Sequence, residues 1–168
     1  MATHRVSLLG GDLLPDTSGN VFFEPYTVKA TNDIFKHGVW VFNDTATKLQ
    51  IFGTCNIPKN YVGTASIIIV WSSTATTGNA VWDVDYRAIT GNDSESLDQA
   101  TFQESVTVTD AAPTAANNRL EVSVNLTSAN LAADDTFEFA IGRDGADAAD
   151  TMAAAAILVD VFLQFNDA

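Results

Sequence analysis

Three aspartates spaced by three residues form the densest group of carboxylates in this sequence. Asp144, Asp147 and Asp150 lie in the segment GRDGADAADTMAAAA, residues 142–156. Carboxylates packed this closely suit either the binding of a cation or the fixing of a tight corner in the backbone. Calcium loops usually place their oxygen ligands at every second residue, so a spacing of three favours the corner.

The residues beside these aspartates support the same interpretation. Arg143 is expected to pair with Asp147 or Asp150, while Asp150 and Thr151 satisfy backbone N–H groups. The alanines of this segment favour a helix, but strict alternation begins at Ile157 and leaves room for one or two turns at most. We therefore predict a structural corner without a metal, and a metal site is the alternative.

Other residues that could do chemistry lack suitable partners. His4 and His37 have no neighbour at a metal-ligand spacing, which indicates surface or interface positions. No nucleophile elbow, phosphate loop or Cys/His arrangement occurs. Asp83 and Asp85 imitate the carboxylate pair of a glycosidase, but outward positions on one strand more often form a solvated face. We predict no catalytic residue and no cofactor.

Aromatic side chains raise a second binding hypothesis. Trp71, Trp82 and Tyr86 could form a platform on which sugar rings stack, because the apolar face of a sugar packs against a flat ring. Alternating positions in apolar strands favour the core instead. The platform is the less favoured interpretation.

The composition bounds the class of protein. The chain has 168 residues and is 46% hydrophobic, which fits one domain with a sizeable core. A net charge of -13 repels nucleic acid and anionic membranes, so we exclude both as partners. The sequence shows neither a signal peptide nor a membrane-spanning stretch, so synthesis and folding in the cytoplasm are expected.

Alternating apolar residues bounded by Gly, Asn and Asp predict about eight strands. AVWDVDYRAI and RLEVSVNLTS alternate most clearly, and ILVDVFLQF is apolar enough to be central. GVWVF and TASIIIVWSS are apolar on both faces, which predicts strands covered on two sides, either by the opposite sheet and a loop or by another subunit. The other predicted strands are KLQIFGTCNIP, FQESVTVTD and TFEFAIGR. Eight antiparallel strands predict an all-β sandwich of jelly-roll type.

The first 20 residues differ from the rest. LLGGDLLPDTSGN pairs its leucines between Gly, Pro and Asp, which is too broken for a helix. We predict an extended arm over residues 1–20 and a sandwich domain over residues 21–168. The leucines of this arm need a neighbouring surface to cover them, and they are Leu8, Leu9, Leu13 and Leu14.

Several segments together resemble small jelly-roll structural proteins of tailed bacteriophages. They are NAVWDVDYRAI, LDQATFQESVTVTDAAPTAANNRLEVS and GRDGADAADTMAAAAILVDVFLQF, with the motif Pro58-Lys59-Asn60-Tyr61-x-Gly63 before them. The resemblance covers residues 36 to 166. It implies a virion component without enzymatic activity, either a capsid cement or decoration protein or part of a head or tail fibre, commonly trimeric.

The leading hypothesis is a homotrimeric cement protein on the capsid surface that bridges subunits of the major capsid protein. Binding only to the assembled lattice would stabilise that lattice by mass action. The four leucines of the arm are the expected capsid or intersubunit contacts. The alternative is a receptor- or carbohydrate-binding module of a phage fibre, and an enzyme of the sandwich class ranks last.

Overall fold

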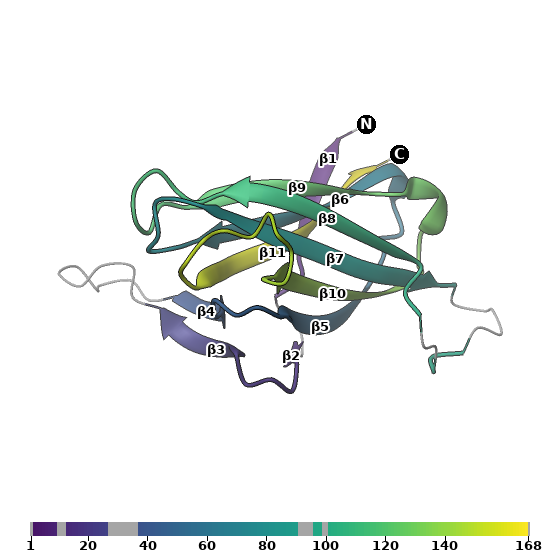
Figure 1. Ribbon diagram of the computed structural model, residues 1–168. Coiled ribbons are helices and arrows are strands. Elements are labelled where there is room, and N and C mark those ends of the chain that lie inside the picture. The colour runs from purple at the N-terminus through teal and green to yellow at the C-terminus, as the bar shows by residue number, and fades with distance from the viewer. Residues whose placement is uncertain (1, 10–12, 27–36, 91–95, 99–100, 168) are drawn as a thin grey trace.

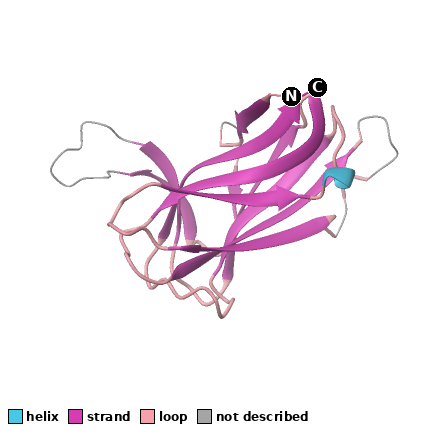
Figure 2. Ribbon diagram, turned by 90° about the horizontal axis from the view of Figure 1, so that it is seen from above, coloured by secondary structure: helices cyan, strands magenta, loops and turns pink. Residues whose placement is uncertain are grey.

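The computed structural model describes residues 2–9, 13–26, 37–90, 96–98 and 101–167. These residues form eleven strands and one short turn of 3-10 helix, η1 (Ser128–Asn130). Figure 2 shows strands and loops almost everywhere, with that single turn of helix at one end. Within the described ranges, no helix is long and apolar enough to cross a membrane.

The strands form two sheets in which every pairing is antiparallel (Figure 1). The six-stranded sheet has the order β3-β4-β11-β6-β9, and β1 also pairs with β11. Its strands are β1 (Thr3–Ser7), β3 (Val21–Tyr26), β4 (His37–Phe42), β6 (Tyr61–Ser72), β9 (Leu120–Leu126) and β11 (Ala156–Asp167). The five-stranded sheet has the order β2-β5-β10-β7-β8. Its strands are β2 (Leu14–Pro15), β5 (Lys48–Asn56), β7 (Asn79–Ile89), β8 (Glu104–Ala111) and β10 (Thr136–Asp144).

All eight predicted strands are present as β4 to β11, and the predicted sandwich of jelly-roll type is confirmed. Without the three N-terminal strands, the sheets read β4-β11-β6-β9 and β5-β10-β7-β8. Most consecutive strands therefore cross from one sheet to the other, and β11 is central, as its apolar composition predicts. The three short strands that precede β4 were not predicted.

The core lies between the two sheets and is built from the inward half of each alternating pattern. Trp71 of β6 and Trp82 of β7 meet edge to face, with ring centroids 5.6 Å apart. Phe42 of β4 contacts Trp82 at the same distance. The indole of Trp71 donates a hydrogen bond of 2.8 Å to Asp110, which satisfies its polar group inside the core.

Strand β11 departs from the sequence prediction in one respect. Unbroken alternation would place five apolar side chains on one face: Ile157, Val159, Val161, Leu163 and Phe165. The register against β6 shifts between Leu158 and Asp160, and such a bulge reverses which side chains face inward. Before the bulge, Leu158 rather than Ile157 faces the core. Ile157 instead packs with Val39 and Val41 in a separate cluster.

The N-terminal segment belongs to the sandwich. Strand β1 pairs with the C-terminal half of β11, and β2 pairs with β5. Leu8 is buried in the main core, and Leu9 and Leu13 pack against it, because the chain crosses there from one sheet to the other. Only Leu14 is strongly exposed, at 64%. Residues 1 and 10–12 of the predicted arm lie outside the described residues.

Candidate functional site

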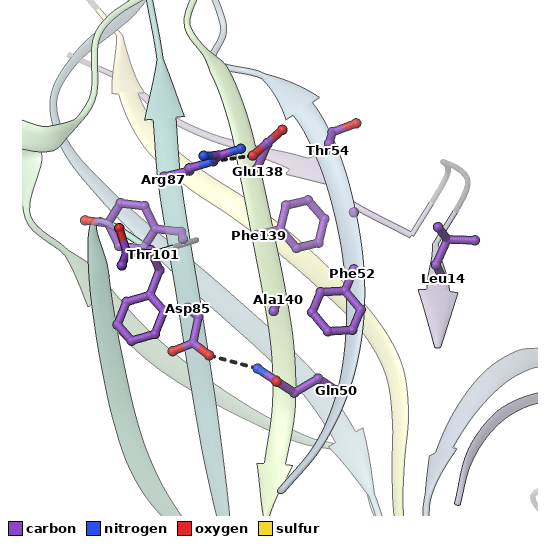
Figure 3. A pocket seen from close by; sticks show the side chains of 13 residues that line it. Leu14, Gln50, Phe52, Thr54, Asp85, Arg87, Thr101, Glu138, Phe139 and Ala140 are labelled. Carbon is purple, nitrogen blue, oxygen red and sulfur yellow. Dashed lines mark hydrogen bonds and ion pairs between the residues drawn. The ribbon is translucent and has the colours of Figure 1, made fainter. Parts of the chain in front are cut away.

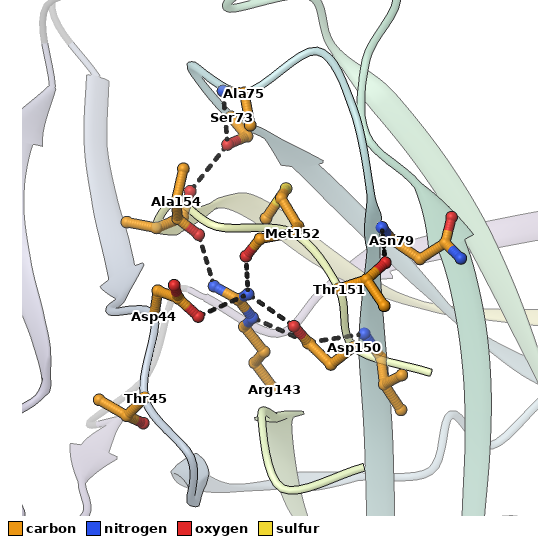
Figure 4. A network of polar contacts seen from close by, with 12 residues as sticks. Asp44, Thr45, Ser73, Ala75, Asn79, Arg143, Asp150, Thr151, Met152 and Ala154 are labelled. Atoms are coloured by element: carbon orange, nitrogen blue, oxygen red, sulfur yellow. Dashed lines mark hydrogen bonds and ion pairs between the residues drawn. The ribbon is translucent and has the colours of Figure 1, made fainter. Parts of the chain in front are cut away.

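The carboxylate-rich segment lies where β10 ends and the chain returns as β11. Arg143 donates hydrogen bonds of 2.9 and 2.7 Å to the two carboxylate oxygens of Asp150. The remaining donors of Arg143 reach the carbonyl oxygens of Met152 and Ala154, each at 2.6 Å. The Arg143 and Asp150 side chains are only 1% and 2% exposed. Figure 4 shows the guanidinium enclosed by the loop that it holds.

The other residues of this corner fix the backbone. Asp150 also accepts a hydrogen bond of 3.0 Å from the N–H of Val81, and the Thr151 hydroxyl accepts one from the N–H of Asn79. Asp147 does not contact Arg143; it caps the N–H of Ala149 at 2.8 Å. No group of three metal-ligating side chains occurs in the described part of the chain. The arrangement is that of a structural corner.

The aromatic platform suggested by the sequence does not form. Trp71, Trp82 and Tyr86 are all fully buried, because the core-facing side of β6 and β7 carries them. The Tyr86 hydroxyl donates to Glu104, and burial together with that carboxylate raises the pKa of Tyr86 to about 12. These three rings stabilise the sandwich and offer no face to a ligand.

A groove of about 640 Å³ lies on the five-stranded sheet, on the face that points away from the core. The sheet residues that line it include Gln50 and Phe52 of β5, Glu138 and Ala140 of β10, and Asp85 and Arg87 of β7. Leu14 of β2 lies beyond β5 (Figure 3). Phe102, which precedes β8 in the chain, also lines the groove. We call this feature the outer-face groove.

Small residues of β10 make the floor of the groove. Ala140 pairs with Phe52 on one side and with Asp85 on the other, and it is the only one of the three without a long side chain. Phe52 is 43% exposed and Phe102 is 57% exposed. The groove therefore has a low centre between taller walls and carries two accessible aromatic rings.

Charged side chains from β5 reach across β10 to carboxylates of β7. Lys48 lies 2.6 Å from Asp83 and 2.8 Å from Asp85, and Gln50 donates to Asp85 at 2.8 Å. These contacts span two strand spacings, about 10 Å, because Ala140 and Gly142 leave the space above β10 open. Asp83 and Asp85 thus belong to a part-buried polar cluster, and the solvated face expected from the sequence is wrong.

The electrostatics of this cluster favour its charged forms. Burial by itself would raise the pKa of Asp85, but hydrogen bonding with Lys48, Ser105 and Gln50 outweighs it and holds the pKa below its ordinary value. Burial by itself would lower the pKa of Lys48, and the contacts with Asp83 and Asp85 raise it instead. Both groups are therefore ionised at neutral pH.

Arg87 and Asp85 each keep one polar atom without a partner. Arg87 donates through Nε to Glu138 and through Nη2 to the carbonyl oxygen of Leu97 at 2.6 Å. Its Nη1 and the Oδ1 of Asp85 are buried and find no hydrogen-bond partner among the described residues. Native proteins rarely leave such atoms unpaired, so a ligand or water is needed to satisfy them.

The sequence interpretation overlooked most of this groove. It placed Asp83, Asp85 and Arg87 on one face of their strand, but it did not identify what they face across the sheet. Phe52 was the available signal, since it is an aromatic residue between Gln50 and Thr54 on the polar side of an alternating strand. His4 and His37, predicted as surface or interface residues, are exposed and lie on β1 and β4, outside the residues that line the groove.

Solved structures similar to this chain are largely carbohydrate-binding modules with jelly-roll-like sandwich folds. A family 35 carbohydrate-binding module from Clostridium thermocellum has a TM-score of 0.57 at 12% identity, over 98% of this chain and 99% of its own. The module CBM35 from Paenibacillus barcinonensis has a TM-score of 0.54 at 11% identity, over 95% of this chain and 97% of its own.

Part of a glycosidase is also similar. An exo-β-1,3-galactanase from Phanerochaete chrysosporium, crystallised with galactose, has a TM-score of 0.52 at 13% identity over 97% of this chain. This chain spans 29% of that enzyme. No protein-family model matches the chain, and no curated protein matches it in sequence. At these identities, the similarity establishes the fold and leaves the function to be argued from the site.

Proposed function

We propose that the protein is a non-catalytic carbohydrate-binding module that holds a saccharide in the outer-face groove. The observation that carries the proposal is a groove with exposed rings, Phe52 and Phe102, beside hydrogen-bonding groups that are already fixed in place. A sugar ring combines an apolar face with a rim of hydroxyl groups, and this surface is complementary to both features. A volume of about 640 Å³ falls within the range of small-ligand sites.

The structural neighbours support the same class of function. Two of them are carbohydrate-binding modules matched over almost their whole length. Their sequences are too different from this one for binding residues to be transferred. The support is therefore at the level of class, and the groove residues are argued from this chain alone.

The carboxylates of the groove argue for binding rather than hydrolysis. A glycosidase needs one carboxyl group with a raised pKa to protonate the leaving oxygen. The pKa of Asp85 is shifted downward, and Glu138 accepts a charge-assisted bond from Arg87. Asp85 is therefore not suited to act as a general acid at neutral pH, and Glu138 is engaged by Arg87, which supports a module that binds without cleaving.

The location of the module is a separate question. The sequence resemblance to tailed-phage proteins implies either a capsid cement protein or a fibre, and the similar solved structures lend no support to a phage origin. Of the two, a fibre is the place where the groove would contact saccharides of a surface receptor. The capsid cement hypothesis has less support, because three of its four leucines are covered by the chain's own core. Sedimentation of the protein with capsids that lack it would test that hypothesis, and the same run would report whether it is a trimer.

The experiment that tests the proposed function is a glycan array followed by titration calorimetry of the best ligand. Phe52→Ala and Phe102→Ala should each weaken binding about tenfold, because each removes an aromatic face. Phe23→Ala is the matched control: this exposed phenylalanine lies on β3, in the other sheet, and should leave affinity unchanged. No binding to any glycan, or equal loss in the control, would overturn the proposal.

A further inference from the structure

The unpaired atoms of the outer-face groove define the chemistry of its ligand. Resting on the proposed function, we infer that the groove selects an uncharged saccharide by gripping a pair of its hydroxyl groups. One hydroxyl donates to Asp85 Oδ1, and another accepts from Arg87 Nη1. Four buried side-chain atoms lack a hydrogen-bond partner in the described part of the chain, and these two belong to side chains that line the groove.

The other two unpaired atoms do not compete for this role. Trp82 Nε1 lies in the fully buried core between the sheets, where no ligand reaches. Asp135 Oδ1 belongs to the turn before β10, where the other oxygen of Asp135 accepts from the N–H of Ala132 at 2.8 Å. The acceptor and donor of the groove therefore stand apart as a pair that shares one surface.

Their spacing is fixed by the strand that carries them. Asp85 and Arg87 are two residues apart on β7, so both side chains lie on the same face of the sheet. Residues two apart on a strand lie about 7 Å apart, so the two free atoms suit hydroxyl groups at separate positions on a saccharide rather than neighbouring ones. One strand thus presents the complementary pair without any loop having to move.

Each side chain is also held in position by its remaining atoms. Asp85 Oδ2 accepts from Lys48 Nζ and Gln50 Nε2, both at 2.8 Å. Arg87 is held by Glu138 and by the carbonyl oxygen of Leu97. The free atoms are consequently pre-organised, and binding does not have to order two long side chains.

The charge of the groove excludes an anionic ligand. Lys48 and Arg87 face three carboxylates, Asp83, Asp85 and Glu138, so the cluster has a net negative charge. The charge of each cation is already balanced by a carboxylate, so the free N–H of Arg87 brings no surplus positive charge that would attract a uronate or a sulfate. The net charge of the whole chain, -13, adds to the repulsion. Hydroxyl groups both donate and accept, and they satisfy the pair without introducing charge.

The test compares neutral and anionic saccharides on the full chain. The probes are neutral galacto-, gluco- and xylo-trisaccharides, with galacturonate and glucuronate trisaccharides as their charged counterparts. We expect binding to at least one neutral probe, no binding to the uronates, and less than about a twofold change in Kd between low and high salt, since no net ion pairing is involved.

Variants of the pair sharpen the test. Arg87→Lys keeps the charge but removes the guanidinium fork, and Asp85→Asn keeps the shape but removes the charge; each should weaken neutral binding about tenfold. Arg119→Lys is the matched control, since Arg119 forms an exposed ion pair with Glu121 on the other sheet. Melting temperatures confirm that each variant is folded.

The outcomes separate the inference from the proposed function. Binding of uronates alone, weakened by salt and by Phe52→Ala, would overturn the neutral ligand and retain a carbohydrate-binding groove. Neutral binding that needs Phe52 but is unchanged in Arg87→Lys and Asp85→Asn would overturn the hydroxyl pair. No saccharide of either class bound would overturn the proposed function and this inference together.

Discussion

Arg143 on β10 and Arg87 on β7 lie at opposite ends of the same strand pair, and their surroundings are built from the same groups. Arg143 contacts two carboxylates, Asp150 and at 3.4 Å Asp44, and two backbone carbonyl oxygens. Arg87 contacts one carboxylate and one carbonyl oxygen. Every nitrogen of the Arg143 guanidinium has a partner, whereas Nη1 of Arg87 has none among the described residues. We call the contacts of Arg143 the complete cluster. The contacts of Arg87 lack one hydrogen-bond partner, at Nη1.

This difference separates a structural role from a binding role. The Arg143 side chain faces the core side of the sheet and ties the corner to β10, so its hydrogen bonds are all used by the fold. Arg87 lies on the outer side, where a groove gives a ligand access. A buried ion pair whose donors are all satisfied maintains the shape of the chain. One that leaves atoms free beside a groove is available for recognition.

The largest expected effect comes from breaking the complete cluster. Asp150→Asn should lower the free energy of unfolding by about 3 kcal/mol, because the buried Arg143 would keep only the half-exposed Asp44, at 3.4 Å, as a counter-charge. Urea unfolding at neutral pH measures this loss. Glu121→Gln, in an exposed ion-pair cluster, should change stability by less than about 1 kcal/mol. A loss from Asp150→Asn as small as that of the control would contradict the comparison.

The leucines of the N-terminal segment extend the same contrast to apolar side chains. Leu8→Ala should cost about 2 to 5 kcal/mol, since Leu8 is buried in the core beside β11. Leu14→Ala should cost about 0.5 kcal/mol or less, because Leu14 is exposed at the groove. Chemical denaturation of both variants tests this. Equal losses would mean that the segment is not integrated into the fold.

The apolar pattern predicted the sandwich well because it recurs along the chain. Segments that alternate, together with two segments that are apolar on both faces, identify β4 to β11, and the apolar run of β11 indicates its central position. Strands β1 and β2 were not predicted, because every residue of β1 is exposed and β2 has only two residues. The sequence also did not predict the bulge in β11, because the bulge depends on pairing with β6 and not on the residues of β11 alone.

The structural corner could be predicted from the sequence and the outer-face groove could not, because the groove joins residues from separate strands. Arg143 and Asp150 are seven residues apart, so their pairing follows from local spacing. The outer-face groove joins β5, β7 and β10, and the contact between Gln50 and Asp85 crosses a third strand. Such a contact depends on sheet order and register, which a single sequence does not specify. Trp71, Trp82 and Tyr86 were considered as a platform because alternation alone does not say which face of a strand is covered.

Filling the groove should remove binding while leaving the complete cluster intact. Ala140→Leu places a larger side chain on the floor between Phe52 and Asp85, so affinity for a neutral trisaccharide should fall at least about tenfold. Stability should fall by about 1 to 3 kcal/mol, as is usual for overpacking. Calorimetric titration with a folding check measures both. Ala140→Ser, which adds a single oxygen atom, is the matched control and should bind within about threefold of the original chain.

The smallest expected effect is that of pH on binding. Asp85 keeps its charge between about pH 5 and about pH 8 because its pKa is lowered, and no histidine lies among the described residues that line the groove. Affinity measured by calorimetry across that interval should therefore stay constant within about twofold.

The sign of any change at lower pH follows from Asp85. Its pKa is lower in the folded chain than in the unfolded one, so its contribution to stability is complete above about pH 4 and is lost as the pH falls through the lowered value. Binding should weaken in the same acidic range, because a protonated Asp85 gives up its contacts with Lys48 and Gln50. A binding midpoint near about pH 6.5 would instead indicate a histidine, and would place the ligand away from the outer-face groove.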